Sequence, residues 1–179
     1  VEEFKQNLIS EEVFVFTPTG ELKSLPIGAT SLDFAFSIHT EIGLKTRGVK
    51  VNGKLVPLNF KLQSGDRVEI LTSEKTKPNV RWLDYATTSK ARKIIKSSLN
   101  DERKKLAEEG KEILRRKLKQ LKISLNEKTV NELVNYFKLK TSLDLFYRVG
   151  INTIDNPLLK KYAASRSNVL MSFLKDKIR

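Results

Sequence analysis

Short runs in the first half of the chain alternate apolar and polar residues, the pattern of strands with one buried face. These runs are Val13 to Thr17, Leu22 to Leu25, Arg47 to Val51, Leu55–Val56 and Arg67 to Leu71. Turn residues separate them, namely Pro18-Thr19-Gly20, Pro26 with Gly28, Asn52–Gly53, and Gly65–Asp66. Because both residues of an Asn-Gly pair tolerate positive φ, Asn52–Gly53 is the strongest hairpin signal in the chain.

One helix is predicted between the second and third runs. Thr30 stands three residues before Asp33, a capping box in which aspartate replaces the usual glutamate. We expect this helix to end near Gly43. Its inward side chains are predicted to be Leu32, Ala35, Phe36 and Ile38. The order of two strands, a helix and three strands in about sixty residues predicts a β-grasp, ubiquitin-like fold.

The second half of the chain has helical periodicity. Apolar residues recur at steps of three and four from Thr88 to about Lys122, which predicts one long helix with Ser89 as its cap. Gly110 and Asn100–Asp101 are two places where this helix could break. Its opposite face is basic, with Lys90, Arg92, Lys93, Lys96, Arg103, Lys104, Lys105, Lys111, Arg115, Arg116, Lys117 and Lys119.

Shorter helices should follow the long one. Residues 127–139 and 142–149 are predicted as helices, and Pro157 begins a fourth. Residues 168–177 are either a fifth helix or a frayed tail. The fold class is therefore α+β. The predicted organisation is an acidic lead-in over residues 1–12, a β-grasp domain over 13–73, a polar linker over 74–86 and an all-α domain over 87–179.

Charge divides along the same line. The net charge is +13, but residues 1–80 contain ten basic and ten acidic residues, so the excess belongs entirely to residues 81–179. A cationic second half indicates a nucleic-acid or other anionic partner. A solvated, lysine-rich helical surface is the alternative. Trp82, the only tryptophan, is expected to pack where the two domains meet rather than to stack on a ligand.

The sequence argues against several kinds of site. It has no cysteine and one histidine, so neither a disulfide framework nor a thiolate metal site is expected, and we predict no cofactor. Gly43 to Gly48 has the outline of a P-loop, but Val49–Lys50 replaces the Lys-Ser/Thr pair and a strand follows. No G-x-S-x-G nucleophile motif occurs. No apolar run approaches the ~20 residues of a membrane span, so we expect a cytoplasmic location.

An ordered set of motifs resembles a TGS domain, and more narrowly that of the RelA/SpoT homologues, the long (p)ppGpp synthetase/hydrolases, also called GTP pyrophosphokinases. The motifs are VFVFTPTG at 13–20, GAT at 28–30, DFA at 33–35, IHT at 38–40, VNG at 51–53 and GDRVEI at 65–70. NVRWLD at 79–84 and TTSKARK at 87–93 resemble the entry into the helical domain of the family. Phe4 to Ser10 resembles the segment after its synthetase domain.

The resemblance implies a regulatory fragment of the stringent response without turnover of its own. Such a fragment would sense uncharged tRNA on the ribosome and relay that state to catalytic domains N-terminal to it. Its implied partners are the 3′ end of deacylated tRNA, ribosomal RNA and those catalytic domains. Whether the longer protein is a synthetase, a hydrolase or both is left open.

Two groups of residues are the candidate RNA contacts. His39 matches the family's histidine that contacts the 3′ CCA end of uncharged tRNA, and an imidazole can stack on an unpaired base. The alternative is a helix-ending histidine that hydrogen-bonds backbone carbonyls. The other candidates are Thr40, Lys45, Arg47 and Lys50 after the first helix, and Lys90, Arg92, Lys93 and Lys96 on the long helix. Leu44 and Thr46 stand where many relatives have His and Cys, which argues against RNA contacts there.

Two other functions remain open. In one, the fragment docks on a protein, either the synthetase domain or an acyl carrier protein, without direct RNA contact. In the other, it belongs to a threonyl-tRNA synthetase or an Obg-like GTPase, which also carry TGS domains. The continuation from Thr87 to Lys93 and the all-α second domain resemble neither of these enzymes.

Overall fold

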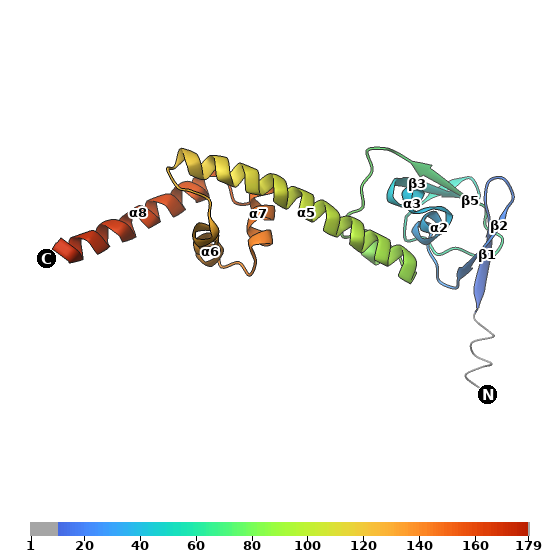
Figure 1. Cartoon of the computed structure of the whole chain (residues 1–179). Helices are drawn as coiled ribbons and strands as arrows, with labels where there is room; N and C mark the ends of the chain where they lie inside the picture. The colour runs from blue at the N-terminus through green and yellow to red at the C-terminus, as the bar shows by residue number, and fades with distance from the viewer. Residues whose placement is uncertain (1–10, 179) are drawn as a thin grey trace, which may run out of the picture. The chain divides into compact units, whose positions relative to one another are not determined.

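Residues 11–178 are described by the computed structural model (Figure 1), and the chain divides into two units between Leu99 and Asn100. The predicted lead-in over residues 1–12 therefore lies almost entirely outside the described residues. The first unit contains β1 Glu12–Phe16, β2 Leu22–Pro26, α2 Ser31–Ile38, α3 Thr40–Leu44, β3 Thr46–Val51, β4 Lys54–Val56, β5 Val68–Thr72 and α4 Trp82–Tyr85. Helix α5, Ser89–Gln120, begins in this unit and continues into the second.

The strands form the predicted β-grasp arrangement. β1 pairs with β2, and β3 lies between β4 and β5, all antiparallel. A parallel bridge from Phe16 to Arg67 connects β1 to the start of β5, so the strand order is β2-β1-β5-β3-β4. At the predicted hairpin, Asn52 and Gly53 have φ of 52° and 82°, and Val51 pairs with Lys54 across a two-residue turn. The fold class is confirmed.

Alternation along the strands places the core on one side of the sheet. Val13, Val15, Val49 and Val68 are buried and pack with Phe34 of α2. The residues between them on β1, Phe14 and Phe16, face outward and are exposed. Helix α2 therefore lies against the buried face of the sheet through Phe34, a residue that the predicted inward set of Leu32, Ala35, Phe36 and Ile38 did not include (Figure 1).

The start of the first helix was predicted correctly, but its end was not. Thr30 caps α2, and the capping box with Asp33 is present. The predicted continuous helix to Gly43 is wrong, because α2 ends at Ile38 and a separate short helix, α3, follows. His39 between them is extended, with φ of −165° and ψ of 147°. A single non-helical residue therefore separates two helices where the periodicity predicted one.

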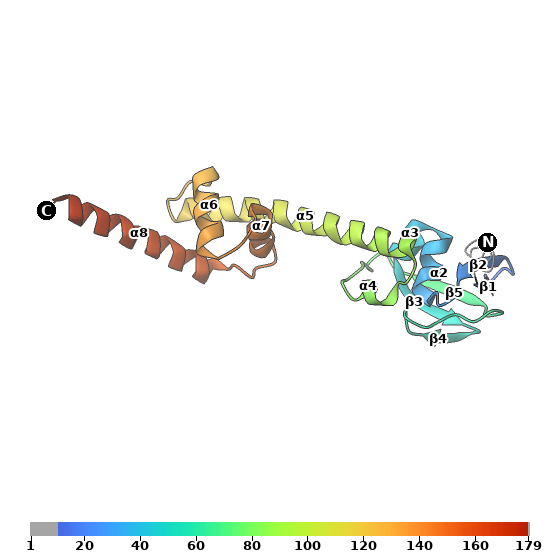
Figure 2. The ribbon, with the colours of Figure 1, turned by 90° about the horizontal axis from the view of Figure 1, so that it is seen from below.

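A second apolar cluster in the same unit joins the β-grasp fold to the start of α5. Leu32 and Phe36 of α2 pack with Trp82 of α4 and with Ala91 and Ile95 of α5. Trp82 is 4% exposed and meets the Phe36 ring edge to face, with centroids 6.4 Å apart. Trp82 has the expected packing role, but its whole cluster lies within the first unit rather than where two domains meet. Figure 2 shows α4 and the start of α5 beside α2 and α3.

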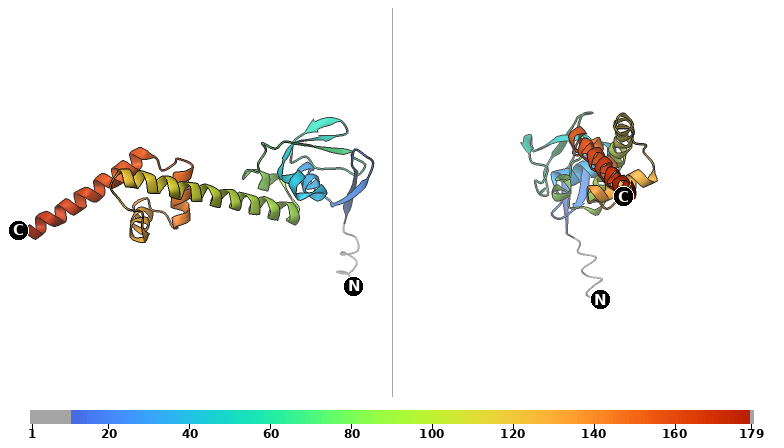
Figure 3. Two further views of the ribbon diagram at one scale, coloured as in Figure 1. Left: turned by 45° about the horizontal axis from the view of Figure 1, so that its top comes forward. Right: turned by 90° about the vertical axis from the view of Figure 1, so that its left-hand side faces the viewer.

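The second unit consists of helices. They are the rest of α5, then α6 Glu127–Tyr136, α7 Ser142–Gly150 and α8 Asn156–Ile178. Buried Leu114 and Leu118 of α5 pack with Leu133 of α6, Leu145 of α7 and Leu159 of α8. Figure 3 shows these helices around that core, with the second half of α8 projecting away from the others. Residues 168–177 are thus part of α8 and form neither a fifth helix nor a separate tail.

Neither predicted break interrupts α5, which runs unbroken for 32 residues. Gly110 is instead buried where α7 crosses, and a Cβ there would collide with the carbonyl oxygen of Phe146 and the amide nitrogen of Gly150. The glycine permits close helix packing rather than a kink. The expected cap is also displaced by one residue, because the Thr88 hydroxyl, not that of Ser89, accepts the Ala91 N–H at 3.3 Å.

Candidate functional site

His39 lies exposed at the junction of α2 and α3. Its Nδ1 accepts the backbone N–H of Glu41 at 3.1 Å, which makes the imidazole the N-cap of α3. The predicted hydrogen bond from His39 to backbone carbonyls is therefore replaced by one in which the ring is the acceptor. Because Nδ1 accepts this bond, the neutral ring carries its proton on Nε2.

This geometry makes His39 suitable for recognising a planar, polar ligand. The ring orientation is held by its own hydrogen bond, so little side-chain entropy remains to be lost on binding. An imidazole so held offers one face for stacking and an Nε2–H donor. Thr40 follows it in the chain and is also exposed.

The position of α3 depends on tight packing behind it. Gly43 is buried, and a Cβ there would overlap the Phe36 ring. The Phe36 ring in turn contacts Trp82 and belongs to the cluster that includes Ile95. Buried side chains thus connect α3, the helix that His39 caps, with the first turns of α5.

The basic residues after α3 are not one cluster. Lys45 is the C-cap of α3, about 9 Å along the helix from His39, and it forms an ion pair of 3.1 Å with Glu74 that raises the pKa of the lysine. Arg47 is exposed and Lys50 is half-buried, both on β3. Thr46 is 1% exposed and donates its hydroxyl to Ile42, so this side chain has no surface to offer to RNA.

The candidates on α5 also divide into two groups. Lys90, Lys93 and Lys96 are exposed at a spacing of three residues and share one side of the helix. Arg92 instead points its guanidinium at backbone carbonyls, donating to those of Leu83 and Ala86. Three of the four predicted cations of this helix therefore remain on the surface, while the fourth holds α4.

Asp33 is the residue whose role the sequence analysis missed. It is 1% exposed, and its carboxylate accepts the backbone N–H groups of Thr30, Thr87 and Thr88 at 2.9 to 3.1 Å. The hydroxyls of Thr87 and Thr88 also donate to it, at 2.7 and 3.0 Å. One carboxylate thus stabilises the starts of both α2 and α5. The sequence signal that could have indicated this role is the Thr87–Thr88 pair just before α5.

The ionised form of Asp33 is favoured despite its burial. Burial acts to raise the pKa of this carboxyl, but hydrogen bonds from Thr30, Thr87 and Thr88 together outweigh it and hold the pKa below its ordinary value of 3.8. The carboxylate is therefore charged over the neutral range, where it also interacts favourably with the N-terminal end of α5.

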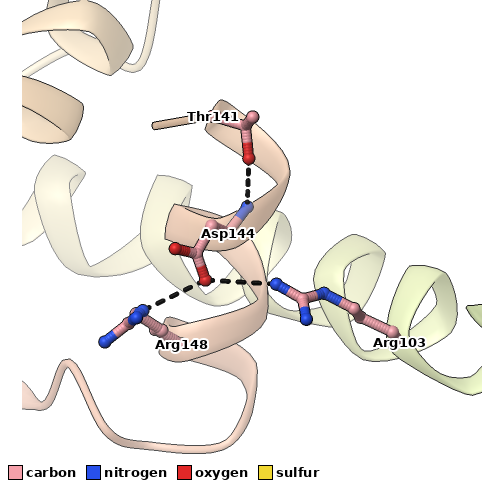
Figure 4. Close-up of polar contacts among 4 residues, drawn as sticks. All are labelled: Arg103, Thr141, Asp144 and Arg148. Atoms are coloured by element: carbon pink, nitrogen blue, oxygen red, sulfur yellow. Dashed lines mark hydrogen bonds and ion pairs between the residues drawn. The ribbon is translucent and has the colours of Figure 1, made fainter. Parts of the chain in front are cut away.

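In the second unit, polar contacts hold α7 against α5 (Figure 4). Asp144 Oδ1 accepts Arg103 Nη2 from α5 at 3.3 Å and Arg148 Nε from α7 at 3.1 Å. The N–H of Asp144 donates to the Thr141 hydroxyl, which caps α7. Arg103 also lies over the Tyr147 ring, 4.7 Å from its centroid. Arg103, counted above on the basic face of the long helix, therefore has a packing role.

Comparison with known proteins follows the same two-part division. The TGS domain model matches residues 13–72, and the RelA/SpoT AH domain model matches residues 100–156. The chain is 43% identical over 162 residues to a guanosine-3′,5′-bis(diphosphate) 3′-pyrophosphohydrolase of Aquifex aeolicus, covering 90% of the chain and 23% of the relative. It is 40% identical over 150 residues to a GTP pyrophosphokinase of Myxococcus xanthus, covering 83% of the chain and 19% of the relative.

A third relative, a GTP pyrophosphokinase of Haemophilus influenzae, is 35% identical over 181 residues, covering 98% of the chain and 23% of the relative. The chain thus spans about a fifth of the length of these relatives. Within residues 11–178, no helix is both long and apolar enough to cross a membrane. In the same range, no three His, Asp or Glu side chains gather as a metal site.

Proposed function

The chain carries a TGS domain followed by a RelA/SpoT AH domain, and from this premise we propose that it is the regulatory region of a cytoplasmic (p)ppGpp synthetase/hydrolase that senses uncharged tRNA on the ribosome. The sensing surface is His39 with Thr40 on the first unit. The region itself performs no turnover, and it relays the state of the tRNA to catalytic domains N-terminal to it.

The observation that carries this proposal is the arrangement of His39. It is the only histidine of the chain, it is exposed, and its ring is held by the Glu41 N–H. The 3′ end of a deacylated tRNA is an unpaired adenosine with free hydroxyls, which the ring can stack on and the Nε2–H can contact. An esterified aminoacyl group occupies that position on a charged tRNA, so a ring held in place can distinguish the two.

Exposed or half-buried cations on the same unit would supply affinity without sequence preference. Lys90, Lys93 and Lys96 of α5, with Arg47 and Lys50 of β3, are the candidates for contacts with tRNA or ribosomal RNA phosphates. The packing behind the His39 ring supports transmission of the signal along the chain. The Phe36 ring contacts Gly43 of α3, and Asp33 accepts a hydrogen bond from the backbone just before α5. A shift of α3 would therefore move the start of α5.

The test compares deacylated with aminoacylated tRNA for binding to the chain on ribosomes with an empty A site, at fixed physiological salt. We expect the parent chain to prefer deacylated tRNA and His39→Ala to lose that preference. Lys93→Ala should weaken both tRNAs alike and reduce the salt dependence of binding by about one counterion.

A matched control distinguishes recognition of tRNA by the His39 ring from the role of His39 as the N-cap of α3. His39→Asn keeps a side-chain oxygen that can cap α3, but it removes the ring and Nε2. If the ring reads the tRNA end, both variants lose the preference while Trp82 fluorescence stays that of the folded unit. A preference retained by His39→Asn, or equal binding of both tRNAs by the parent chain, would contradict the proposal.

A second candidate function, protein docking, is favoured by the outer face of the sheet. Phe14 and Phe16 of β1 and Leu22 of β2 are exposed, and Phe16 and Leu22 are paired across the strands, so they form one apolar patch. Such a patch fits a contact with the catalytic domains or with an acyl carrier protein. The variant Phe16→Ser should then abolish co-purification with that partner and leave tRNA discrimination unchanged.

A further inference from the structure

A groove in the second unit is not part of the RNA-sensing surface. It lies between α6 and α8, beside the turn that follows α5, and encloses about 990 Å³. Its walls include Tyr136 of α6, Tyr162, Leu170 and Phe173 of α8, and Ile123 of the turn. This volume is at the upper end of small-molecule sites.

The aromatic side of the groove is preorganised. Tyr136 meets Tyr162 edge to face, with ring centroids 5.3 Å apart. The Tyr162 hydroxyl donates to Glu132 at 2.8 Å, and Arg166 lies 3.6 Å from the same carboxylate. These contacts hold the two rings in place and balance the charge of Glu132. A ligand would therefore bind to this side of the groove without large rearrangement of its side chains.

Apolar side chains continue from the groove along α8. Leu170 is 60% exposed and Phe173 is 56% exposed, and Val169 beside them also lines the groove. Met171, Leu174 and Ile178 extend the exposed apolar surface over the rest of the helix. Exposed apolar side chains gathered on one element in this way mark an interaction site rather than an ordinary surface.

The charges around the groove are mainly positive. Lys122 and Lys128 are exposed and line it, and residues 100–179 contain 19 basic and 10 acidic residues. We propose that this groove binds an amphipathic helix of a partner protein, with apolar residues on one face and carboxylates along its edges. Arg166, Leu170 and Phe173, at steps of four and three on α8, have the spacing of a helix-in-groove contact.

The shape and lining favour a protein over the other anionic partners. The groove is hollowed between α6 and α8, a shape that a partner helix fits better than a flat membrane surface does. Aliphatic Val169 and Leu170 offer neither stacking nor hydrogen bonds to a nucleic-acid base. A helix with apolar side chains can fill the groove while its carboxylates meet Lys122 and Lys128.

The experiment measures anisotropy of a fluorescein-labelled 18-residue peptide against the full chain. The peptide has leucine at steps of three and four and glutamate or alanine elsewhere. We expect Phe173→Ser to weaken binding about tenfold, since it removes an exposed apolar anchor. Lys128→Glu should weaken binding about fivefold, because it loses an ion pair and adds repulsion. Both side chains are exposed, so both variants are expected to fold.

Matched variants on the same helix control for nonspecific effects. Ile178→Ser removes a more exposed apolar side chain outside the groove, and Lys160→Glu reverses an exposed charge that does not line it. Both should change binding less than twofold. An equal loss in these controls would overturn the proposed site.

Other probes test the class of partner. Equal or tighter binding of a peptide with lysine in place of glutamate, or of one with the leucines scrambled, would overturn the proposal. So would absence of peptide binding combined with Phe173-dependent binding to phosphatidylglycerol vesicles or to a 12-nucleotide single-stranded RNA. Because this site lies on the second unit, the result does not depend on whether His39 reads tRNA.

Discussion

Replacing Asp33 with alanine should destabilise the first unit more than any surface change. The substitution removes the acceptor for six donors, three backbone N–H groups and three hydroxyls, at a side chain that is 1% exposed. It removes the capping box of α2 and the polar link to the start of α5 together.

The magnitude follows from which donors water can reach. The N–H of Thr30 is buried, and leaving it unpaired costs about 1–3 kcal/mol. Thr87 and Thr88 are at least partly exposed, so water can replace the carboxylate as their hydrogen-bond acceptor. Losing the bonds of each threonine therefore lowers the free energy of unfolding by only about 0.5–1 kcal/mol. The expected loss for Asp33→Ala is therefore about 3 kcal/mol, and a smaller loss is expected for Asp33→Asn, which keeps one acceptor oxygen.

Trp82 is the natural reporter, since it is the only tryptophan and packs in the cluster beside this link. Urea unfolding followed by Trp82 fluorescence should show this loss of unfolding free energy at pH 7. The control is Asp84→Asn, which replaces an exposed carboxylate of α4. Its free energy of unfolding should lie within about 0.5 kcal/mol of that of the parent chain. A loss below about 1 kcal/mol for Asp33→Ala would refute the reasoning, because the donors would then have found other partners.

The same link predicts a pH dependence. The pKa of Asp33 is lower in the folded chain than its ordinary value of 3.8, so its contribution is complete above that value and is lost as pH falls through the folded pKa. The difference in the free energy of unfolding between the parent and Asp33→Asn should be constant from pH 5 to 7 and shrink at lower pH. A difference that grows toward acid would contradict the assigned sign.

Two further predictions concern the second unit. Gly110→Ala should destabilise this unit by about 2–4 kcal/mol, because the added Cβ collides with the carbonyl oxygen of Phe146, although alanine is the better helix former. Guanidinium unfolding followed by circular dichroism measures the change. A stabilised variant would contradict the close crossing of α5 and α7. Burial first, and then the hydrogen bond to Glu132, raise the pKa of Tyr162 from its ordinary value of 10.0 to about 12. The folded state should therefore lose stability as pH rises beyond about 10, where the unfolded chain ionises this residue first. Glu132→Gln should lower that pKa in an absorbance titration at 295 nm, and an unchanged titration would refute the assignment.

Local features were predictable because they depend on residues close in the chain. The alternation of Val13 and Val15, the positive φ values of Asn52–Gly53 and the Thr30 cap each follow from sterics and hydrogen bonds within a few residues. Together they were enough to predict the β-grasp fold. They did not place His39 correctly, because the predicted helix ran on to Gly43, whereas α2 ends at Ile38 and the His39 ring caps the next helix.

The chain by itself thus determined its strands, its turns and the starts of most helices, together with the positive charge of its second half. Only the tertiary structure decided what depends on distant partners. The sequence around Gly110 is the same whether the glycine breaks a helix or permits close packing of α7. From its neighbours in sequence, Asp33 is an ordinary capping residue, and only the fold shows that it also accepts hydrogen bonds from Thr87 and Thr88. The groove beside α8 likewise exists only because Tyr136 and Tyr162, far apart in the sequence, pack together. Such contacts arise from packing between elements, which periodicity within one element does not encode.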